Sequence, residues 1–385
     1  MKLAPHSRCS GCSACHDICP RNAISMVPDD EGFLYPQIDE TRCVACGRCA
    51  EACPSLHPGK SRTPLAVYAA KAKDDELRLK SSSGGVFSLL SWQVIARGGI
   101  VYGAGFDHDD WHVMHKSAEN EEELADLRGS KYVQSDTRGV YAAIKDNLIS
   151  GREVLFSGTP CQVAGLRTYL ELQHVPTSKL LLVDVVCHAV PSPLVWRKYL
   201  AQRLAQAGSS AKIMRISFRN KGYGWKRFSL SLCFAEGKEY LRDLHADSFL
   251  RGFLSELYNR PSCHNCQCRE LRGGSDLTIA DYWRVHEKFP EMDDDRGTSL
   301  VLVNTEKGTD KWKTVSRECV SCISDFNYAV RINPALVRSC LPHLKRKKFF
   351  KGIGGSEFDR MIFELLKRPL WRRAASRIKR YLLGV

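Results

Sequence analysis

The sequence predicts an α+β protein in three parts: a cysteine-rich module at the amino-terminal end, an α/β body, and a basic amphipathic helical tail. Three observations support this division. Eight of the 17 cysteines fall within residues 9–53, apolar strands alternate with helices beyond residue 65, and 13 of the 57 basic side chains fall within residues 344–385. We expect domains at residues 1–58, 65–207, 208–343 and 344–385.

Composition narrows the class of protein. Hydrophobic residues make up 43% of the chain and charged residues 26%, as in a globular protein. No stretch reaches the roughly 18 uncharged apolar residues of a membrane-spanning helix, and the first residues lack a signal-peptide core, so we expect a cytoplasmic protein. Disulfides are rare there, and dense cysteine therefore indicates metal ligation. The net charge of +14 is concentrated in the tail, so no nucleic-acid partner is expected.

Two cysteine runs define the first domain. Each has the spacing C-x2-C-x2-C-x3-C-P of bacterial two-cluster ferredoxins, in which the fourth cysteine of each run ligates the other cluster. One 4Fe-4S cluster is therefore expected on Cys9, Cys12, Cys15 and Cys53. The other is expected on Cys43, Cys46, Cys49 and Cys19. A pair of zinc sites is the alternative, but zinc usually takes two separated C-x2-C pairs.

A short linker at residues 55–64 (SLHPGKSRTP) leads into the body. The pattern predicts a strand at residues 66–72, a buried helix at residues 86–95 and a strand at residues 100–106. Residues 81–85 (SSSGG) stand directly before that helix, where small residues bare backbone N–H groups and favour an anion. The alternative is an ordinary serine–glycine cap of the helix.

The next stretch predicts a parallel strand–helix–strand arrangement. Buried strands at residues 154–156 and 180–186 flank a helix that Thr159 caps. Cys161 falls in the first turn of this helix, and Cys187 falls just past the second strand. Because open α/β sheets bind ligands at the carboxyl ends of their strands, we expect both thiols at the ligand-binding edge.

A third group of cysteines, Cys263, Cys266 and Cys268, is close enough in sequence to bind three corners of another cubane. Cys161 is the expected fourth ligand, and Cys187 is the second choice. A zinc site or reduced structural thiols are the alternatives.

The remaining cysteines of the body are not expected to bind metal. Cys319 and Cys322 lie in a segment that reads as a strand, and Cys233 and Cys340 are expected in the core. The segments at residues 213–219 and 226–234 read as two strands that pair.

From residue 66 to about residue 309, the chain resembles the coenzyme F-420 hydrogenase/dehydrogenase beta-subunit family. The resemblance rests on the order of seven phrases: SSSGG at 81–85, GSKYVQS at 129–135, FSGTPCQVAGL at 156–166, VVCHAVPSP at 185–193, FRNKGYGW at 218–225, RPSCHNCQC at 260–268 and SDLTIADYW at 275–283. It is closest to bacterial, ferredoxin-fused members that are associated with cell-surface polysaccharide genes.

The resemblance implies FAD in the body, and hence a two-cluster ferredoxin module joined to an α/β flavin-binding body. The implied flavin contacts are Ser82, Ser83, Gly84, Gly85, Ser130, Lys131, Tyr132, Gln134 and Asp281. It also implies a third 4Fe-4S cluster on Cys161, Cys263, Cys266 and Cys268. Ala189 and Arg284 stand where the family often has glycine. A side chain at either position could change which substrate binds, because it would keep a ligand from approaching the backbone closely. Nothing in the sequence supports the deazaflavin coenzyme itself as the substrate.

Three side chains are candidates for catalysis. Lys131 could stabilise negative charge on a reduced flavin, and His188 and Lys221 are candidate proton donors. For each of them, a structural ion pair or hydrogen bond is the alternative.

Two classes of function follow. The first is an iron–sulfur flavoprotein oxidoreductase that reduces or oxidises an organic substrate, with the family context pointing to cell-surface polysaccharide biosynthesis. The second is a non-catalytic electron-transfer subunit that feeds a separate catalytic partner. Both require a redox donor or acceptor protein, because the clusters move one electron at a time.

The tail reads as an amphipathic helix with a basic face. Residues 356–383 place apolar side chains at helical spacing, with a restart at Pro369, and six basic residues between 368 and 380 cover much of the rest. Such a helix suits the anionic inner face of a membrane. A helix docked on its own body is the alternative.

Overall fold

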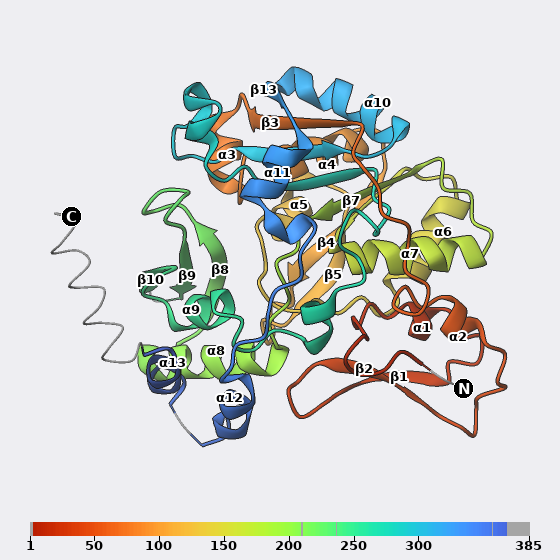
Figure 1. The fold of residues 1–385 in the computed structure, drawn as a ribbon, viewed down its shortest axis with the longest axis horizontal. Coiled ribbons are helices and arrows are strands. Elements are labelled where there is room, and N and C mark those ends of the chain that lie inside the picture. Colours follow the sequence, from red (N-terminus) through yellow and green to blue (C-terminus); the bar gives the residue numbers. More distant parts are fainter. Residues whose placement is uncertain (1–2, 209–210, 236, 356, 368–385) are drawn as a thin grey trace, which may run out of the picture.

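The computed structural model describes residues 3–208, 211–235, 237–355 and 357–367. Its central sheet consists of β3 (Ala66–Ala72), β4 (Ile100–Phe106), β5 (Val113–Ala118), β6 (Val154–Gly158), β7 (Leu180–Val185), β11 (Leu277–Asp281), β12 (Ser299–Val303) and β13 (Cys319–Ser324). These eight strands follow the order β13-β3-β12-β11-β7-β6-β4-β5 (Figure 1). The inner strands β4, β6, β7 and β11 are parallel, and antiparallel strands extend the sheet on both sides.

Helices cover both faces of this sheet, as the alternation of its side chains requires. One face packs against α3 (Asp75–Lys80), α4 (Val86–Ile95), α5 (Glu121–Leu127) and α10 (Glu306–Val315). The other packs against α6 (Val140–Ile149), α7 (Pro160–Leu172) and α11 (Phe326–Ile332). Within β6, Leu155 faces the first group, whereas Val154 and Phe156 face the second. The structure is thus of mixed α and β type, and the α/β body expected within the predicted α+β protein is present.

The predicted parallel unit is present. β6 and β7 pair in parallel with Val154 opposite Leu180. Between them α7 begins after Thr159, which forms a capping box with Gln162. Cys161 lies in the first turn of α7 and Cys187 follows β7, so both thiols lie at the carboxyl edge of the sheet, as predicted.

A smaller layer stands beside the main sheet (Figure 1). It contains the antiparallel strands β8 (Ile213–Asn220), β9 (Ser229–Phe234) and β10 (Glu239–Asp243), with α8 (Pro193–Ala207) and α9 (Ser248–Leu254). The predicted pairing of β8 with β9 is confirmed. Short 3-10 turns elsewhere are η1 (Pro261–Asn265), η2 (Val285–Glu287), η3 (Pro290–Met292), η4 (Ser316–Glu318) and η5 (Pro334–Leu336).

The first part of the tail docks on this smaller layer. α12 (Arg346–Gly352) and α13 (Phe358–Leu366) pack with α8 and α9, and Ile362 is 0% exposed. The apolar side of α13 is therefore covered by the protein's own body, as the alternative of a docked helix predicts, and not by a membrane. The rest of the predicted amphipathic helix, residues 368–383, lies outside the described residues.

The amino-terminal module contains α1 (Ala14–Asp17), β1 (Ile24–Pro28), β2 (Leu34–Ile38) and α2 (Arg48–Glu51). β1 and β2 form an antiparallel hairpin. Ala14 and Ile18 share a core with Tyr141 of α6 and Leu166 of α7, so the module is built into the body. Among the described helices, none is long and apolar enough to cross a bilayer.

Candidate redox centres

The amino-terminal module has two hollows, each lined by four cysteines drawn from both runs. Cys9, Cys12, Cys15 and Cys53 line the first, which we call site I. Cys19, Cys43, Cys46 and Cys49 line the second, which we call site II. The structure thus brings together the two sets that the spacing predicts. Four thiols around a hollow form the donor set of a 4Fe-4S cubane.

Site I is the more enclosed of the two. Cys9 and Cys12 are each 8% exposed, whereas Cys46 of site II is open to solvent. Burial and the neighbouring Cys53 raise the pKa of the Cys12 thiol far above its usual range. Ionisation of this thiol therefore needs a bound cation, which the metal ions of a thiolate-ligated cluster would supply.

The loop of site I packs directly on the body. A Cβ atom added to Gly165 of α7 would come within 3.0 Å of Cys12 Sγ. Thr137 Oγ1 donates to the carbonyl oxygen of Cys12 at 3.0 Å, and the backbone N–H of Tyr141 donates to the Asp17 carboxylate at 3.1 Å. These contacts fix site I against α6 and α7.

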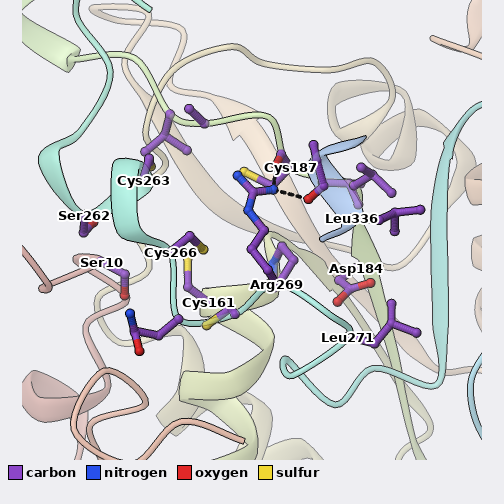
Figure 2. A pocket seen from close by; sticks show the side chains of 18 of the residues that line it. Ser10, Cys161, Asp184, Cys187, Ser262, Cys263, Cys266, Arg269, Leu271 and Leu336 are labelled. Atoms are coloured by element: carbon purple, nitrogen blue, oxygen red, sulfur yellow. Dashed lines mark hydrogen bonds between the residues drawn. The ribbon is translucent and has the colours of Figure 1, made fainter. Parts of the chain in front are cut away.

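A pocket at the carboxyl edge of the main sheet gathers five more thiols (Figure 2). We call it the body pocket, and its lining cysteines are Cys161, Cys187, Cys263, Cys266 and Cys268. Ser10 and Ser55 of the amino-terminal module also line it, so the body pocket adjoins site I. Both sequence candidates for the fourth ligand are present: Cys161 lies beside Cys266, and Cys187 lies beside Arg269 (Figure 2).

The walls of the body pocket are fixed by an arginine and include a buried acid. Arg269 donates to the carbonyl oxygens of Cys187 and, at 3.0 Å, His188. Burial and the neighbouring Cys266 raise the pKa of the Cys263 thiol to about 12. Asp184 is 1% exposed, and burial raises the pKa of its carboxyl to about 7. Clustered soft thiols favour a thiolate-bound metal centre.

The other cysteines do not form a further metal site among the described residues. Cys319 and Cys322 lie on opposite faces of β13, so one metal ion cannot bind both. Cys319 is buried, as a strand position allows. Cys233 and Cys340 were expected in the core, but both are only partly buried: Cys233 faces Arg215, and Cys340 Sγ donates to the Cys263 carbonyl oxygen at 3.7 Å.

Four of the predicted flavin contacts gather around an arginine that sequence reasoning did not single out. Arg219 is 5% exposed and forms an ion pair with Asp281 at 3.0 Å. Its Nη atoms donate to Tyr132 Oη and to the carbonyl oxygen of Ser82, each at 3.4 Å. The backbone N–H of Ser130 donates to Ser82 Oγ at 2.7 Å. We call these five residues the Arg219 group.

Aromatic rings flank the buried guanidinium of the Arg219 group. The guanidinium lies over the rings of Phe228 and Trp283, at 4.0 and 5.2 Å from their centroids. Arg219 Nε is buried and has no hydrogen-bond partner among the described residues. An unsatisfied buried donor beside hydroxyl groups and aromatic rings fits the carbonyl and nitrogen edge of a flavin.

The remaining residues of the serine–glycine turn are engaged within the protein. Ser83 Oγ donates to the carbonyl oxygen of Thr298, and the N–H of Gly84 donates to Ser299 Oγ, both at 2.9 Å. Gly85 caps α4 with φ 90°, a conformation that favours glycine. The predicted anion site therefore lacks the Gly84 donor, and this part of the turn serves as a cap.

Lys131 and Lys221 make structural contacts. Lys131 Nζ donates to the carbonyl oxygens of Asp126 and Arg128 at 2.8 and 2.9 Å. Lys221 Nζ donates to three carbonyl oxygens, including that of Ser83 at 3.1 Å. Burial lowers the pKa of each lysine to about 7.

His188 and Gln134 lie apart from the Arg219 group. His188 Nε2 forms an ion pair with Glu256 at 2.5 Å, and its ring packs edge-on against Phe253. The structure places the Gln134 amide at the amino-terminal module, where it accepts from Arg260 Nη1 at 2.7 Å. Of the two positions where the family often has glycine, Ala189 lines the body pocket and Arg284 adopts a left-handed φ of 58°.

Comparisons with known proteins agree with this layout. Residues 67–141 match the N-terminal model of the coenzyme F420 hydrogenase/dehydrogenase beta subunit, and residues 151–326 match its C-terminal model. The chain belongs to this family. Residues 8–56 match a 4Fe-4S dicluster domain, so the amino-terminal module is an iron–sulfur domain.

Individual relatives are distant. One subunit of the F(420)H(2) dehydrogenase of Methanosarcina mazei is 24% identical over 197 residues, which are 48% of this chain and 55% of that protein. The chain thus matches about half the length of this relative. A chain of the F420-reducing NiFe hydrogenase complex of Methanosarcina barkeri is 19% identical, with a TM-score of 0.47 over 79% of this chain and 93% of that one.

Proposed function

We propose that this chain is an iron–sulfur flavoprotein oxidoreductase that passes electrons between its 4Fe-4S clusters and FAD to reduce or oxidise an organic substrate. FAD would supply the exchange between single electrons from clusters and electron pairs for an organic molecule. The proposal rests on the adjacency of site I, the body pocket and the Arg219 group. Site I shares a wall with the body pocket through Ser10, and packed aromatic rings connect the edge of the body pocket with Tyr132 of the Arg219 group.

The second link runs through packed rings. His188 follows Cys187 of the body pocket, and its ring lies 5.8 Å from that of Phe253. Phe253 lies 5.0 Å from Tyr132, whose hydroxyl accepts from Arg219. Continuous packing over this route supports electron exchange between the body pocket and a ligand at the Arg219 group.

For the third 4Fe-4S cluster we propose Cys161, Cys263, Cys266 and Cys268 as ligands, because Cys161 lies beside Cys266 and is the fourth ligand that the family resemblance implies, although Cys187 also lies beside Cys263. Cys161→Ser should lower the iron content by about four atoms per chain. Cys187→Ser is the matched control and should retain the full content. Iron loss in Cys187→Ser alone would make Cys187 the ligand. If neither variant loses iron, the proposal of a third cluster is wrong.

For FAD we propose contacts with the Arg219 group. Arg219→Gln should bind less than a tenth of the wild-type flavin while keeping its iron. Arg227→Gln is the control, because Arg227 lies eight residues away with a largely exposed side chain that pairs with Asp243. Flavin retention in Arg219→Gln at the wild-type level would place the flavin elsewhere.

The catalytic candidates take different roles in this proposal. Lys131 and Lys221 position backbone carbonyl oxygens beside the Arg219 group. His188 remains the candidate proton donor, since its ring is half-exposed and paired with Glu256.

A non-catalytic electron-transfer subunit is the second candidate function. The exposed thiol of Cys46 is consistent with it as with the first, because an open cluster site can exchange electrons with a docked partner protein. Turnover of a purified single chain with flavin, reductant and candidate sugar or lipid-linked precursors separates the two functions. The polysaccharide role predicts consumption of such a precursor, and activity only on adding a second protein supports the electron-transfer role.

Membrane attachment is proposed only for the segment after Lys367. A chain truncated after Lys367 keeps α13 and its buried face, so its fold should persist. Loss of pelleting with anionic liposomes in this truncation would support a peripheral location at the inner membrane face. Unchanged pelleting would end the idea.

A further inference from the structure

One arginine at site I is buried without a carboxylate. Arg260 is 0% exposed and stands just before η1, which carries Cys263. Its Nε donates to the carbonyl oxygen of Cys9 at 2.8 Å, and its Nη2 lies 3.7 Å from Cys9 Sγ in hydrogen-bonding geometry. Its Nη1 donates to Gln134 Oε1 at 2.7 Å. Three contacts of this guanidinium thus reach Cys9 of site I or Gln134, whose Nε2 donates to the carbonyl oxygen of Ser10 at 3.3 Å.

Aromatic rings complete the surroundings of this cation. The guanidinium carbon lies 4.2 Å from the ring centroid of Tyr35 and 5.4 Å from that of Phe33. Nη2 also donates to the carbonyl oxygen of Leu34 at 2.9 Å. Among the described residues, no acidic side chain forms an ion pair with Arg260. A buried charge without a counter-charge is costly, so an anion is required next to it.

Three other buried arginines pair with carboxylates, whereas buried Arg269 of the body pocket, like Arg260, donates only to uncharged groups among the described residues. Arg203 pairs with Asp359, Arg219 with Asp281 and Arg78 with Asp294. Arg260 instead faces a cysteine of site I, where a cubane with four thiolates carries a negative charge that grows on reduction. The contact with Gly11 is equally close, since a Cβ added there would lie 2.8 Å from Arg260 Nη1.

We infer that Arg260 is the built-in counter-charge of the site I cluster and holds its reduction potential above that of the site II cluster. The added electron makes the cluster more negative, so a fixed buried cation and an N–H···S contact favour the reduced form. Site II has no equivalent among the described residues: Arg21, which lines it, is exposed to solvent and therefore screened.

This difference in reduction potential sets the direction of electron transfer between the two clusters. One electron from a one-electron donor protein enters at exposed site II and comes to rest at site I, against the body pocket. The inference rests only on the iron–sulfur part of the proposed function. Absence of flavin, or of the third cluster, would leave it standing.

The test is a mediated redox titration of the full-length, anaerobically loaded protein, followed by electron paramagnetic resonance. Arg260→Gln should lower the equilibrium constant for reduction of the site I cluster at least tenfold, which is about 59 mV for a one-electron couple. Arg260→Lys keeps the charge and should recover most of the wild-type potential. Cys46→Ser perturbs the site II signal and so identifies which signal belongs to site I.

A second variant guards against loss of folding. Gln134→Glu keeps the size of the side chain and Arg260, but places a carboxylate against Nη1 and neutralises the cation. It should lower the site I potential in the same direction. Arg203→Gln is the control, because Arg203 is a buried arginine on α8, stacked on Tyr199, with no contact to site I among the described residues.

The outcomes are decisive in either direction. A lowered site I potential in Gln134→Glu, with the control unchanged, supports the inference even if Arg260→Gln does not fold. The inference is overturned if, in cluster-loaded Gln134→Glu, the equilibrium constant for reduction of the site I cluster stays within twofold of the wild-type value. An equal fall in Arg260→Lys and Arg260→Gln also overturns it, because packing rather than charge would then set the potential.

Discussion

Replacement of Asp184 by asparagine tests the electrostatics of the body pocket. Asp184 is 1% exposed, and its Oδ1 has no hydrogen-bond partner among the described residues. Burial is the main cause that raises the pKa of this carboxyl from 3.8 to about 7. Between these two pH values the folded protein binds a proton that the unfolded chain has released, so stability falls as the pH rises.

The free-energy cost of ionising Asp184 follows from the difference between the two pKa values. Each pH unit is worth about 1.36 kcal/mol, so the ionised carboxyl costs up to about 4 kcal/mol above pH 7. Asp184→Asn removes this cost, because the amide has nearly the same shape and stays neutral. We expect the variant to be more stable than wild type at pH 8, with a gap that shrinks toward zero as the pH falls to 4.

Urea unfolding of anaerobic protein from pH 5 to pH 8.5 measures the gap. Asp146→Asn is the matched control, since the Asp146 side chain is 71% exposed and should change stability by less than about 0.5 kcal/mol at any pH. A gap between Asp184→Asn and wild type that does not grow with pH would refute the reasoning. A less stable variant at pH 8 would show that the ionised carboxylate is needed.

Two further predictions concern metal content and the tail. Cys263→Ser should lose about four iron atoms per chain while Cys319→Ser, on a strand of the sheet, should lose none; equal iron in both would contradict a metal centre in the body pocket. Ile362→Ala should lower the free energy of unfolding by about 2–5 kcal/mol, because Ile362 is 0% exposed, whereas Phe363→Ala on the exposed side of α13 should cost less than about 1 kcal/mol. Urea denaturation compares the two, and similar small losses would mean that α13 is not docked.

Local signals in the sequence were sufficient for much of the fold. The predicted bounds of β3, α4 and β4 match the observed ones, because each is a run of one periodicity closed by glycine or turn residues. The capping box before Cys161 and the exchange of cysteines between runs are likewise local rules of spacing. These rules placed Cys161 and Cys187 at one edge of the sheet.

The features that sequence reasoning missed depend on contacts across long stretches of chain. Arg260 acts on Cys9, 251 residues earlier, and Arg219 meets Ser82 from 137 residues away. The sequence segments around Arg219 and Arg260 carry no signal that distinguishes these buried arginines from arginines on the surface. The family resemblance placed Gln134 among the flavin contacts because it belongs to the segment GSKYVQS, yet its amide accepts a hydrogen bond from Arg260. The burial of α13 depended on a matching surface on α8 and α9, which periodicity alone does not reveal.

Quantitation of iron, acid-labile sulfide and flavin in one anaerobic preparation tests the central claim most directly. The account predicts a brown protein with about 12 iron atoms, about 12 sulfides and one FAD per chain. A colourless preparation would contradict it altogether, and about eight iron atoms without flavin would leave only the amino-terminal iron–sulfur domain.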